Sequence, residues 1–327
     1  MILPYLARLT CLSLACFFLV QLLVGSAVSW LAPFALAIAR RASARFAAGF
    51  LFAIRMLPAA AGILAVALLC VPSYLWLEAD AGGERVGAVC LGAALLGLAA
   101  WIIALVRGLR AIRRSLEYER RCRLGGCELL LAGETVWIVD SAGGLLALAG
   151  VAPARLFVSR AVLENLSAEQ LEVALGHERA HRISRDNLRR LLLLLTPDLL
   201  PGALRFLGGL RAIELGWARF AEWAADDLAV AGDPRRRASL AAALVRVARL
   251  GCAAQSTLLV TSLVSDGRDL EARVERLLET SPAGRDSRSH GAIFGVVTIL
   301  CAVFAALVAI HAATLQAAHQ LFEYLLR

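Results

Sequence analysis

The sequence predicts a multi-pass α-helical membrane protein with four transmembrane helices and an inserted cytoplasmic α+β domain. The 327-residue chain is 60% apolar, whereas soluble domains are about 45–50% apolar. Four apolar stretches are long enough to cross a bilayer, which takes about 20 residues. A segment of mixed polarity separates the third stretch from the fourth, and it is long enough to form one domain.

These stretches define the predicted domains. Residues 1–107 hold three transmembrane helices, at about 9–38, 46–77 and 86–106, and residues 108–290 form the cytoplasmic domain. Residues 291–327 hold the fourth transmembrane helix, at roughly 292–315, and a short tail. The first stretch is too long for the apolar core of a cleaved signal peptide, so we expect it to stay in the membrane.

The distribution of arginine orients the spans. Arg40, Arg41 and Arg45 lie between the first two spans, and a cluster of arginines from Arg107 to Arg123 follows the third. The link between the second and third spans is acidic. We expect a multi-pass protein of the inner cell membrane, and its positively charged loops stay in the cytoplasm. The middle domain is then cytoplasmic, and the N-terminus and C-terminus lie outside.

The net charge of +8 bears on the predicted partners, and all 34 basic residues are arginine. The Arg107–Arg123 cluster adjoins a span and has no nucleic-acid recognition motif beside it. We therefore expect it to contact membrane lipids with anionic headgroups, and we expect no direct nucleic-acid binding. Arg55, inside the second span, either has a function or extends toward the cytoplasmic headgroups.

The cysteines are expected to be structural thiols. Several lie in apolar spans, where they behave as small hydrophobes: Cys11, Cys16, Cys70, Cys90 and Cys301. Cys122 and Cys127 have the spacing C-x4-C but lack the partners of a second zinc site. Their cytoplasmic placement argues against disulfide bonds.

The middle domain begins with strand patterns and continues with helical ones. Short apolar runs separated by glycine-rich turns predict a small antiparallel sheet, with strands at 128–131, 135–139, 145–148 and 156–159. One exposed edge strand could pair with an extended peptide. The apolar segment Leu191–Leu210, broken by Pro197 and Pro201, forms either a helical hairpin against the bilayer or part of the core.

The most informative motif is His177-Glu178-Arg179-Ala180-His181. Histidines four residues apart share a helix face, and their imidazoles can bind one Zn²⁺. Glu178 can take a proton from a zinc-bound water, as in the hydrolase signature H-E-x-x-H. Ser167 and Gln170 form a capping box that starts this helix. The motif therefore predicts a zincin-like metallopeptidase domain with one Zn²⁺ per chain.

A catalytic zinc usually has three protein ligands, so a third ligand should lie downstream. The best candidate is Glu222, in the pattern E-x-x-A-D, and Glu214 is a weaker alternative. Asp226, one turn after Glu222, and Asp186, five residues after His181, could orient the ligating histidines. His290 and Arg273 are candidates for stabilising the oxyanion.

These residues carry a resemblance to the gluzincin-type membrane metallopeptidases, and most of all to the BlaR/MecR-type sensor-transducers. The chain resembles that group in its two motifs, H-E-x-x-H with Asp186 and E-x-x-A-D. It also resembles that group in having three spans before the first motif and one after it. The segments 156–158, 163–170 and 270–278 resemble its strand, turn and last helix. The resemblance implies zinc-dependent cleavage of cytoplasmic protein substrates in signal transduction, namely a transcriptional repressor, the protease itself, or both.

Two alternatives stay open beside this interpretation. HtpX-type membrane quality-control proteases share the metal motifs, and a non-catalytic signalling scaffold could carry a structural or defunct metal site. The sequence also departs from BlaR/MecR-type proteins, because only a short tail follows the last span. We therefore do not expect acylation by β-lactams to be the stimulus.

Overall fold

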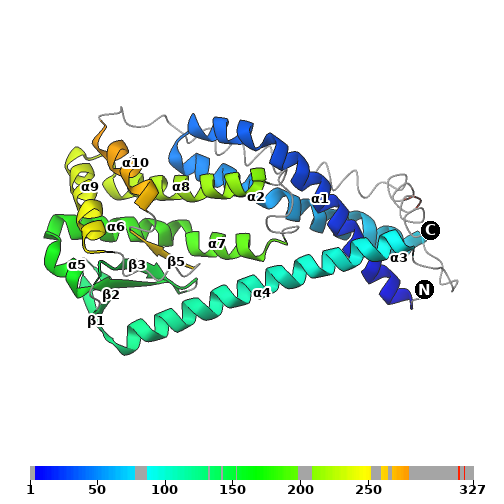
Figure 1. The fold of residues 1–327 in the computed structure, drawn as a ribbon, viewed down its shortest axis with the longest axis horizontal. Helices are drawn as coiled ribbons and strands as arrows, with labels where there is room; N and C mark the ends of the chain where they lie inside the picture. The colour runs from blue at the N-terminus through cyan, green and yellow to red at the C-terminus, as the bar shows by residue number, and fades with distance from the viewer. Residues whose placement is uncertain are drawn as a thin grey trace.

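The computed structural model describes residues 4–77, 87–131, 133–140, 143–151, 153–197, 208–251, 259–263 and 267–279, together with residues 316 and 320. These residues form an elongated molecule. A bundle of long helices lies at one end, and a domain of sheet and shorter helices lies at the other (Figure 1).

Three helical segments of the bundle are long and apolar enough to cross a membrane. The first is α1 (Tyr5–Arg40), and the third is α4 (Ala88–Leu124). The second begins as α2 (Ala44–Ala65), passes through the π-helical turn η1 (Val66–Cys70) and ends as α3 (Val71–Leu77). Three long apolar helices are thus present where the three N-terminal spans were predicted. The predicted fourth span at 292–315 and the acidic link lie outside the described residues.

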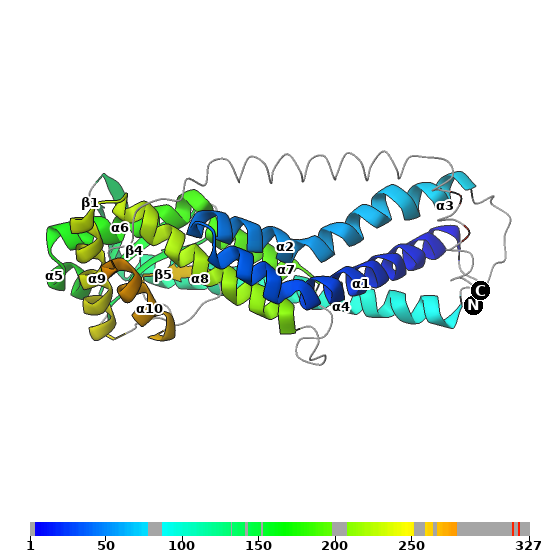
Figure 2. The ribbon, with the colours of Figure 1, turned by 90° about the horizontal axis from the view of Figure 1, so that it is seen from above.

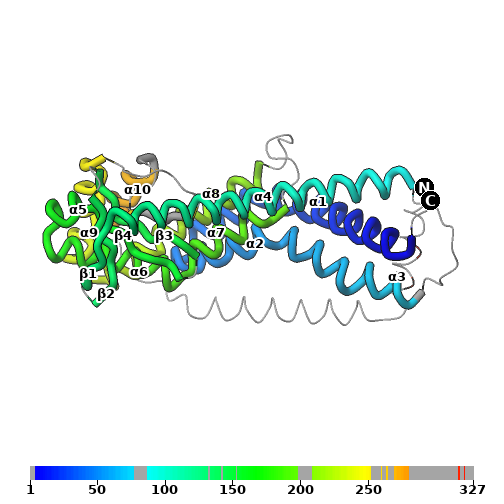
Figure 3. The backbone as a smooth tube through the Cα atoms, turned by 90° about the horizontal axis from the view of Figure 1, so that it is seen from below, coloured from blue at the N-terminus to red at the C-terminus, as the bar shows by residue number. Residues whose placement is uncertain are grey.

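Helix α4 is longer than the predicted third span. It continues past Val106 as one helix of 37 residues that ends at Leu124, and Figure 3 shows it running without a break toward the sheet. Arginine has a high helix propensity, so the arginine cluster extends the helix instead of ending it. α4 therefore joins the bundle to the sheet directly.

The sheet contains five strands in the order β1-β2-β4-β3-β5. They are β1 (Gly126–Leu131), β2 (Glu134–Val139), β3 (Leu146–Ala149), β4 (Arg155–Ser159) and β5 (Val260–Ser262). The first four lie within two residues of the predicted strands. The expectation of a purely antiparallel sheet was wrong, because β4 enters between β2 and β3 and pairs in parallel with β2.

The edge of the sheet beside β3 is occupied. β5 pairs antiparallel with β3, with Ala147 opposite Ser262 and Ala149 opposite Val260. The sequence analysis did not predict this strand, which is short and lies about one hundred residues after β3 in the chain. An extended peptide could pair with β3 only if β5 left that position.

Helices cover the sheet and form its core. After β4 come α5 (Arg160–Asn165), α6 (Ala168–Ser184), α7 (Asp186–Leu195), α8 (Gly208–Val230), α9 (Pro234–Arg249) and α10 (Gly267–Leu278). Apolar side chains of the sheet, α6 and α9 make one buried cluster, which includes Val158, Leu175 and Leu244. Burial of this surface is the main force that holds α6 against the sheet.

A second buried cluster fixes α8 to the bundle. Ile213, Trp217 and Phe220 of α8 pack against α1 and α2, and Figure 2 shows these helices side by side. At Gly209 the backbones come so close that an added Cβ would collide with the Ser29 carbonyl oxygen. The helix that carries Glu222 is therefore part of the bundle as well as part of the domain.

The start of the segment Leu191–Leu210 also packs on protein. The Gln21 side chain of α1 donates a hydrogen bond to the Pro197 carbonyl oxygen, and Leu195 lies over Gly108 of α4. This part of the segment therefore belongs to the protein core, and residues 198–207 lie outside the described residues.

Candidate metal centre

Helix α6 presents the two histidines of the motif side by side. The predicted capping box is present, with the Ser167 side chain accepting from the Gln170 backbone and the Gln170 side chain accepting from the Ser167 backbone. His177 and His181 follow one turn apart and are fully buried. The apolar residues of the same helix that face the sheet core keep this turn in place.

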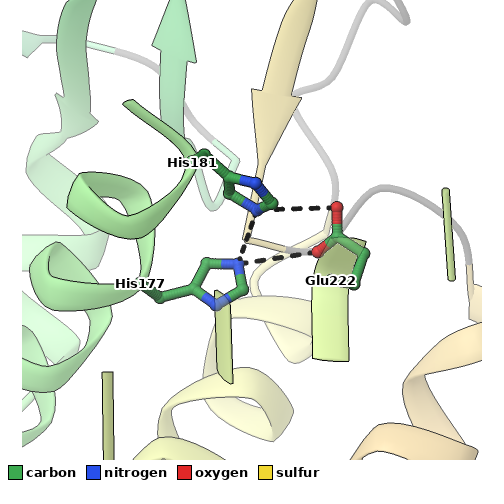
Figure 4. Close-up of side chains that lie close together, drawn as sticks. All are labelled: His177, His181 and Glu222. Atoms are coloured by element: carbon green, nitrogen blue, oxygen red, sulfur yellow. Dashed lines mark hydrogen bonds and ion pairs between the residues drawn. The ribbon is translucent and has the colours of Figure 1, made fainter. Parts of the chain in front are cut away.

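Glu222 of α8 completes a group of three ligands (Figure 4). One ligand atom from each of His177, His181 and Glu222 lies within 4.8 Å of the others. The two Nε2 atoms are 3.1 Å apart, and they lie 3.5 Å and 3.6 Å from the Glu222 oxygens. Tetrahedral zinc with bonds of about 2.0–2.1 Å needs ligand atoms about 3.3 Å apart. The geometry therefore fits one Zn²⁺.

In both histidines, the ring nitrogen that faces away from this centre lies beside the carboxylate of an aspartate. Nδ1 of His177 lies 2.9 Å from Asp226 Oδ1, and Nδ1 of His181 lies 2.7 Å from Asp186 Oδ2. An Nδ1–H that donates to a carboxylate leaves the Nε2 lone pair free for a metal. The predicted positions of Asp226 and Asp186 behind the ligands agree with this geometry.

A left-handed residue brings Asp186 back to His181. Arg185 has φ 54° and ψ 42°, and it separates α6 from α7. This conformation is uncommon for a residue with a side chain. The sharp turn allows Asp186, the first residue of α7, to reach the histidine five positions earlier. Asn187 then fixes the turn by donating to the carbonyl oxygens of Leu148 and Gly150.

Glu178 is buried beside the ligands, and its carboxylate oxygens have no hydrogen-bond partner among the described residues. Burial raises the pKa of Glu178 to about 7, although the charges of His177 and His181 oppose this effect. A buried carboxylate without a partner is costly, and such groups occur where chemistry uses them. Its burial beside His177 and His181 is compatible with the predicted role of Glu178 as a general base.

The site attracts positive charge. Burial on its own would lower the pKa of His181, but the charge of Glu222 and the hydrogen bond to Asp186 outweigh it and raise the pKa to about 10. The pKa of His177 is also raised, because its hydrogen bonds to Asp226 and Glu222 outweigh burial. The same carboxylates would stabilise a bound dication. Because a metal binds only neutral imidazoles, binding would release the protons of the two histidines.

Arg273 of α10 connects several parts of the site, and the sequence analysis did not anticipate this role. Its Nε and Nη2 donate to the two carboxylate oxygens of Asp226 at 2.9 and 2.6 Å, and its Nη1 donates to the Leu263 carbonyl oxygen at 2.8 Å. Nη1 also lies 3.2 Å from Glu222 Oε2. The guanidinium therefore holds Asp226 behind His177 and ties the end of β5 to the site.

Three other residues that the sequence analysis singled out are not seen at the metal centre. Glu214, the alternative third ligand, is not in the ligand group, and its Oε2 lies 3.6 Å from Nε of Arg55. Arg55 is buried beside Glu214 of α8, and of its two alternatives this burial does not favour extension toward the headgroups. His290, the other oxyanion candidate, lies outside the described residues.

The comparison with known proteins agrees with this site. The model of Peptidase family M48 matches residues 134–281, a range that begins at β2 and contains every residue of the metal centre. A search of curated proteins found no significant match to the chain. Fold and site together define a zinc-dependent metallopeptidase. Residues 134–281 are similar to that family, and the chain is a multi-pass membrane zinc peptidase whose metal is held by His177, His181 and Glu222.

Proposed function

We propose that the enzyme is an endopeptidase that cleaves cytoplasmic protein segments, with Glu178 as its general base and with residues 108–290 as its cytoplasmic peptidase domain. The observation that carries this proposal is the buried Glu178 carboxylate, which has no partner among the described residues and adjoins the three zinc ligands. When bound, zinc supplies Lewis acidity toward water and the scissile carbonyl group.

Four side chains of the site transfer the proton or hold the zinc ligands in place. Glu178 accepts the proton of the attacking water and returns it to the leaving amine, for which a pKa near 7 is well matched. Asp226 and Asp186 hold the imidazoles in the orientation and tautomer that the ligands need. Arg273 keeps Asp226 ionised and in place, because it neutralises that carboxylate inside the protein.

The change Glu178→Gln tests the role of Glu178. Gln has nearly the same shape, so we expect the purified full chain to fold and bind zinc normally but to lose at least about 100-fold in peptide cleavage. Glu172→Gln on the exposed side of the same helix is the matched control, and it should cleave like the wild type. Cleavage by Glu178→Gln at the wild-type rate would rule out this mechanism.

The proposed biological role is signal transduction of the BlaR/MecR type. The resemblance in motif order and span arrangement supports it, whereas the match to the family model does not separate this group from HtpX-type quality-control proteases. A winged-helix repressor encoded beside this protein would be the expected substrate. Cleavage of that purified repressor, without cleavage of unfolded membrane proteins, would favour transduction, and the opposite preference would favour quality control.

Self-cleavage is the second part of the proposed role. β5 pairs with the strand edge at which an extended substrate would be expected to bind, and the Leu263 carbonyl oxygen contacts Arg273 of the site. A cut in the described segment 259–263 that appears in the wild type and is absent in Glu178→Gln would support self-cleavage. Intact wild-type chain under conditions where another substrate is cut would contradict it.

We further propose that the peptidase domain is cytoplasmic, with both chain termini outside. The arginines at the α1–α2 turn and along α4 support this orientation. Cys127 on β1 is exposed, and it provides a test. A membrane-impermeant thiol reagent should label Cys127 in inside-out vesicles and not in intact cells, whereas labelling in intact cells would reverse the topology.

A further inference from the structure

Arg190 of α7 is a second arginine beside the ligand carboxylate of Glu222. Its Nη2 lies 3.7 Å from Oε1 of Glu222, whereas Nη1 of Arg273 lies 3.2 Å from Oε2 of the same carboxylate. Oε1 is also the oxygen that lies 3.6 Å from Nε2 of His181. One guanidinium therefore lies beside each oxygen of this zinc ligand.

The position of Arg190 is set by α7, which continues from α6 toward the bundle (Figure 1). Asp186 and Arg190 are four residues apart, so they share one face of this helix. Asp186 contacts His181 from that face, and Arg190 approaches Glu222 from it. On α4, Leu195 of α7 packs over Gly108. This packing on the bundle helps to hold the face of α7 that carries both charged residues toward the metal ligands.

Arg190 is more accessible than the ligands that it approaches. Its side chain is 22% exposed, whereas that of Glu222 is 9% exposed and that of His181 is fully buried. Its separation of 3.7 Å from Glu222 is an ion pair that is longer than an N–H···O hydrogen bond. A guanidinium does not lose its proton in proteins. Arg190 is therefore a permanent positive charge that a substrate can reach beside the metal ligands.

Arg273, which the sequence analysis named as an oxyanion candidate, is committed to other groups. Its Nε and Nη2 donate to Asp226, its Nη1 donates to the Leu263 carbonyl oxygen, and its side chain is only 4% exposed. Cleavage of a peptide bond is aided by a donor beside the carbonyl oxygen, because negative charge develops there as water attacks. Of these two arginines, Arg190 is the one whose exposure suits that role.

We propose that Arg190 is a catalytic residue that stabilises the oxyanion formed on the scissile carbonyl group, an inference that rests on the proposed peptidase function. As the oxygen of water bonds to the carbonyl carbon, a proton passes to Glu178 and the electron pair of the C=O bond moves onto the carbonyl oxygen. Arg190 donates a hydrogen bond to that oxygen. When the C–N bond breaks, the pair returns to the C=O bond and the amine takes the proton from Glu178. Because the interaction strengthens as the charge develops, Arg190 raises kcat more than it lowers KM.

The test uses the zinc-loaded full-length protein in lipid nanodiscs. A peptide that the wild type cuts is first selected from a random peptide library, and its phosphinic analogue carries a tetrahedral phosphinate in place of the scissile group. In Arg190→Gln we expect kcat to fall about 100–1,000-fold with KM nearly unchanged. The phosphinate should bind at least about 100-fold more weakly. Zinc affinity, measured by competition with a chelator, should be retained, because the lost positive charge repels a dication.

Two further variants complete the test. Arg219→Gln is the matched control, because Arg219 of α8 is 54% exposed and pairs with Asp269 at the surface, and it should behave like the wild type. Arg190→Lys keeps the charge beside Glu222 but lacks the planar fork of donors, so it should fold and lose less activity than Arg190→Gln.

The possible outcomes separate this inference from the proposed function. Wild-type kcat and phosphinate affinity in either folded Arg190 variant would overturn the role of Arg190, and so would failure of both variants to fold or to bind zinc, which would make the residue structural. In those cases the wild type still cleaves the peptide. A wild type that binds zinc but cleaves no member of the library would instead contradict the proposed function.

Discussion

Asp226 offers a quantitative test of how the metal centre is held together. Its Oδ1 lies 2.9 Å from Nδ1 of His177 and accepts a hydrogen bond from Arg273, and its Oδ2 accepts another from Arg273. The change Asp226→Asn keeps the shape but removes the charge. Loss of a carboxylate behind a ligating histidine typically weakens metal binding by about 10–100-fold. Breaking one side of a buried ion pair costs about 3–5 kcal/mol of folding free energy.

We expect the cost in stability for Asp226→Asn to lie near the lower end of that range, at about 3 kcal/mol. The reason is that Glu222 Oε2 still lies 3.2 Å from the Arg273 guanidinium. Zinc affinity is measured by competition with a chromophoric chelator, and stability is measured by denaturant unfolding of the purified chain.

The neighbouring residue supplies the control for this experiment. Asp227 pairs with Arg276 at the surface, where the side chains are 49% and 30% exposed. Asp227→Asn should therefore cost less than about 1 kcal/mol and leave zinc affinity unchanged. The reasoning would be refuted if Asp226→Asn bound zinc as tightly as the wild type, or if both variants behaved alike.

Three further predictions concern packing, pH and the metal. Gly209→Ala should lower the thermal midpoint of unfolding, because its Cβ would collide with the Ser29 backbone. In the control Gly208→Ala, the added Cβ meets nothing within 4 Å, so this change should be neutral or stabilising. Equal midpoints for the two variants would contradict the packing of α8 on α1. Burial alone would raise the pKa of Glu134, but Arg182 and Arg179 hold it below its ordinary value. The pairing therefore stabilises the fold at pH values above the ordinary pKa, and this stabilisation is lost as the pH falls through the lowered pKa. Glu134→Gln should therefore flatten the decline in stability below about pH 4.3, and an unchanged profile would exclude this pairing as a contributor. Removal of zinc by a chelator should lower the midpoint and abolish cleavage, both should return when zinc is added back, and a midpoint that does not change would show that zinc does not bind the folded site.

The sequence determined the parts of the site that depend on local spacing. Histidines four residues apart on a capped helix had to share a face, and the pattern E-x-x-A-D placed Glu222 and Asp226 one turn apart. The positions of four strands could likewise be read from short apolar runs between turns. These features require only the geometry of a single helix or strand.

The features that could not be predicted depend on contacts between distant segments. Nothing local marks Arg273 as the partner of Asp226, because 47 positions separate them. β5 is a strand only because the edge of β3 is available to it. The pairing of Arg55 with Glu214 likewise arises when separate helices pack. A single sequence shows the residue types involved and not their partners.

The most direct test of the central claim is X-ray absorption spectroscopy at the zinc edge of the purified enzyme. A metal held by His177, His181 and Glu222 predicts one zinc per chain with two imidazole ligands and at least one oxygen ligand near 2.0 Å. Glu222→Ala should alter this spectrum and weaken binding, whereas Glu214→Ala should match the wild type. A sulfur ligand, or a spectrum unchanged by Glu222→Ala, would contradict the proposed centre.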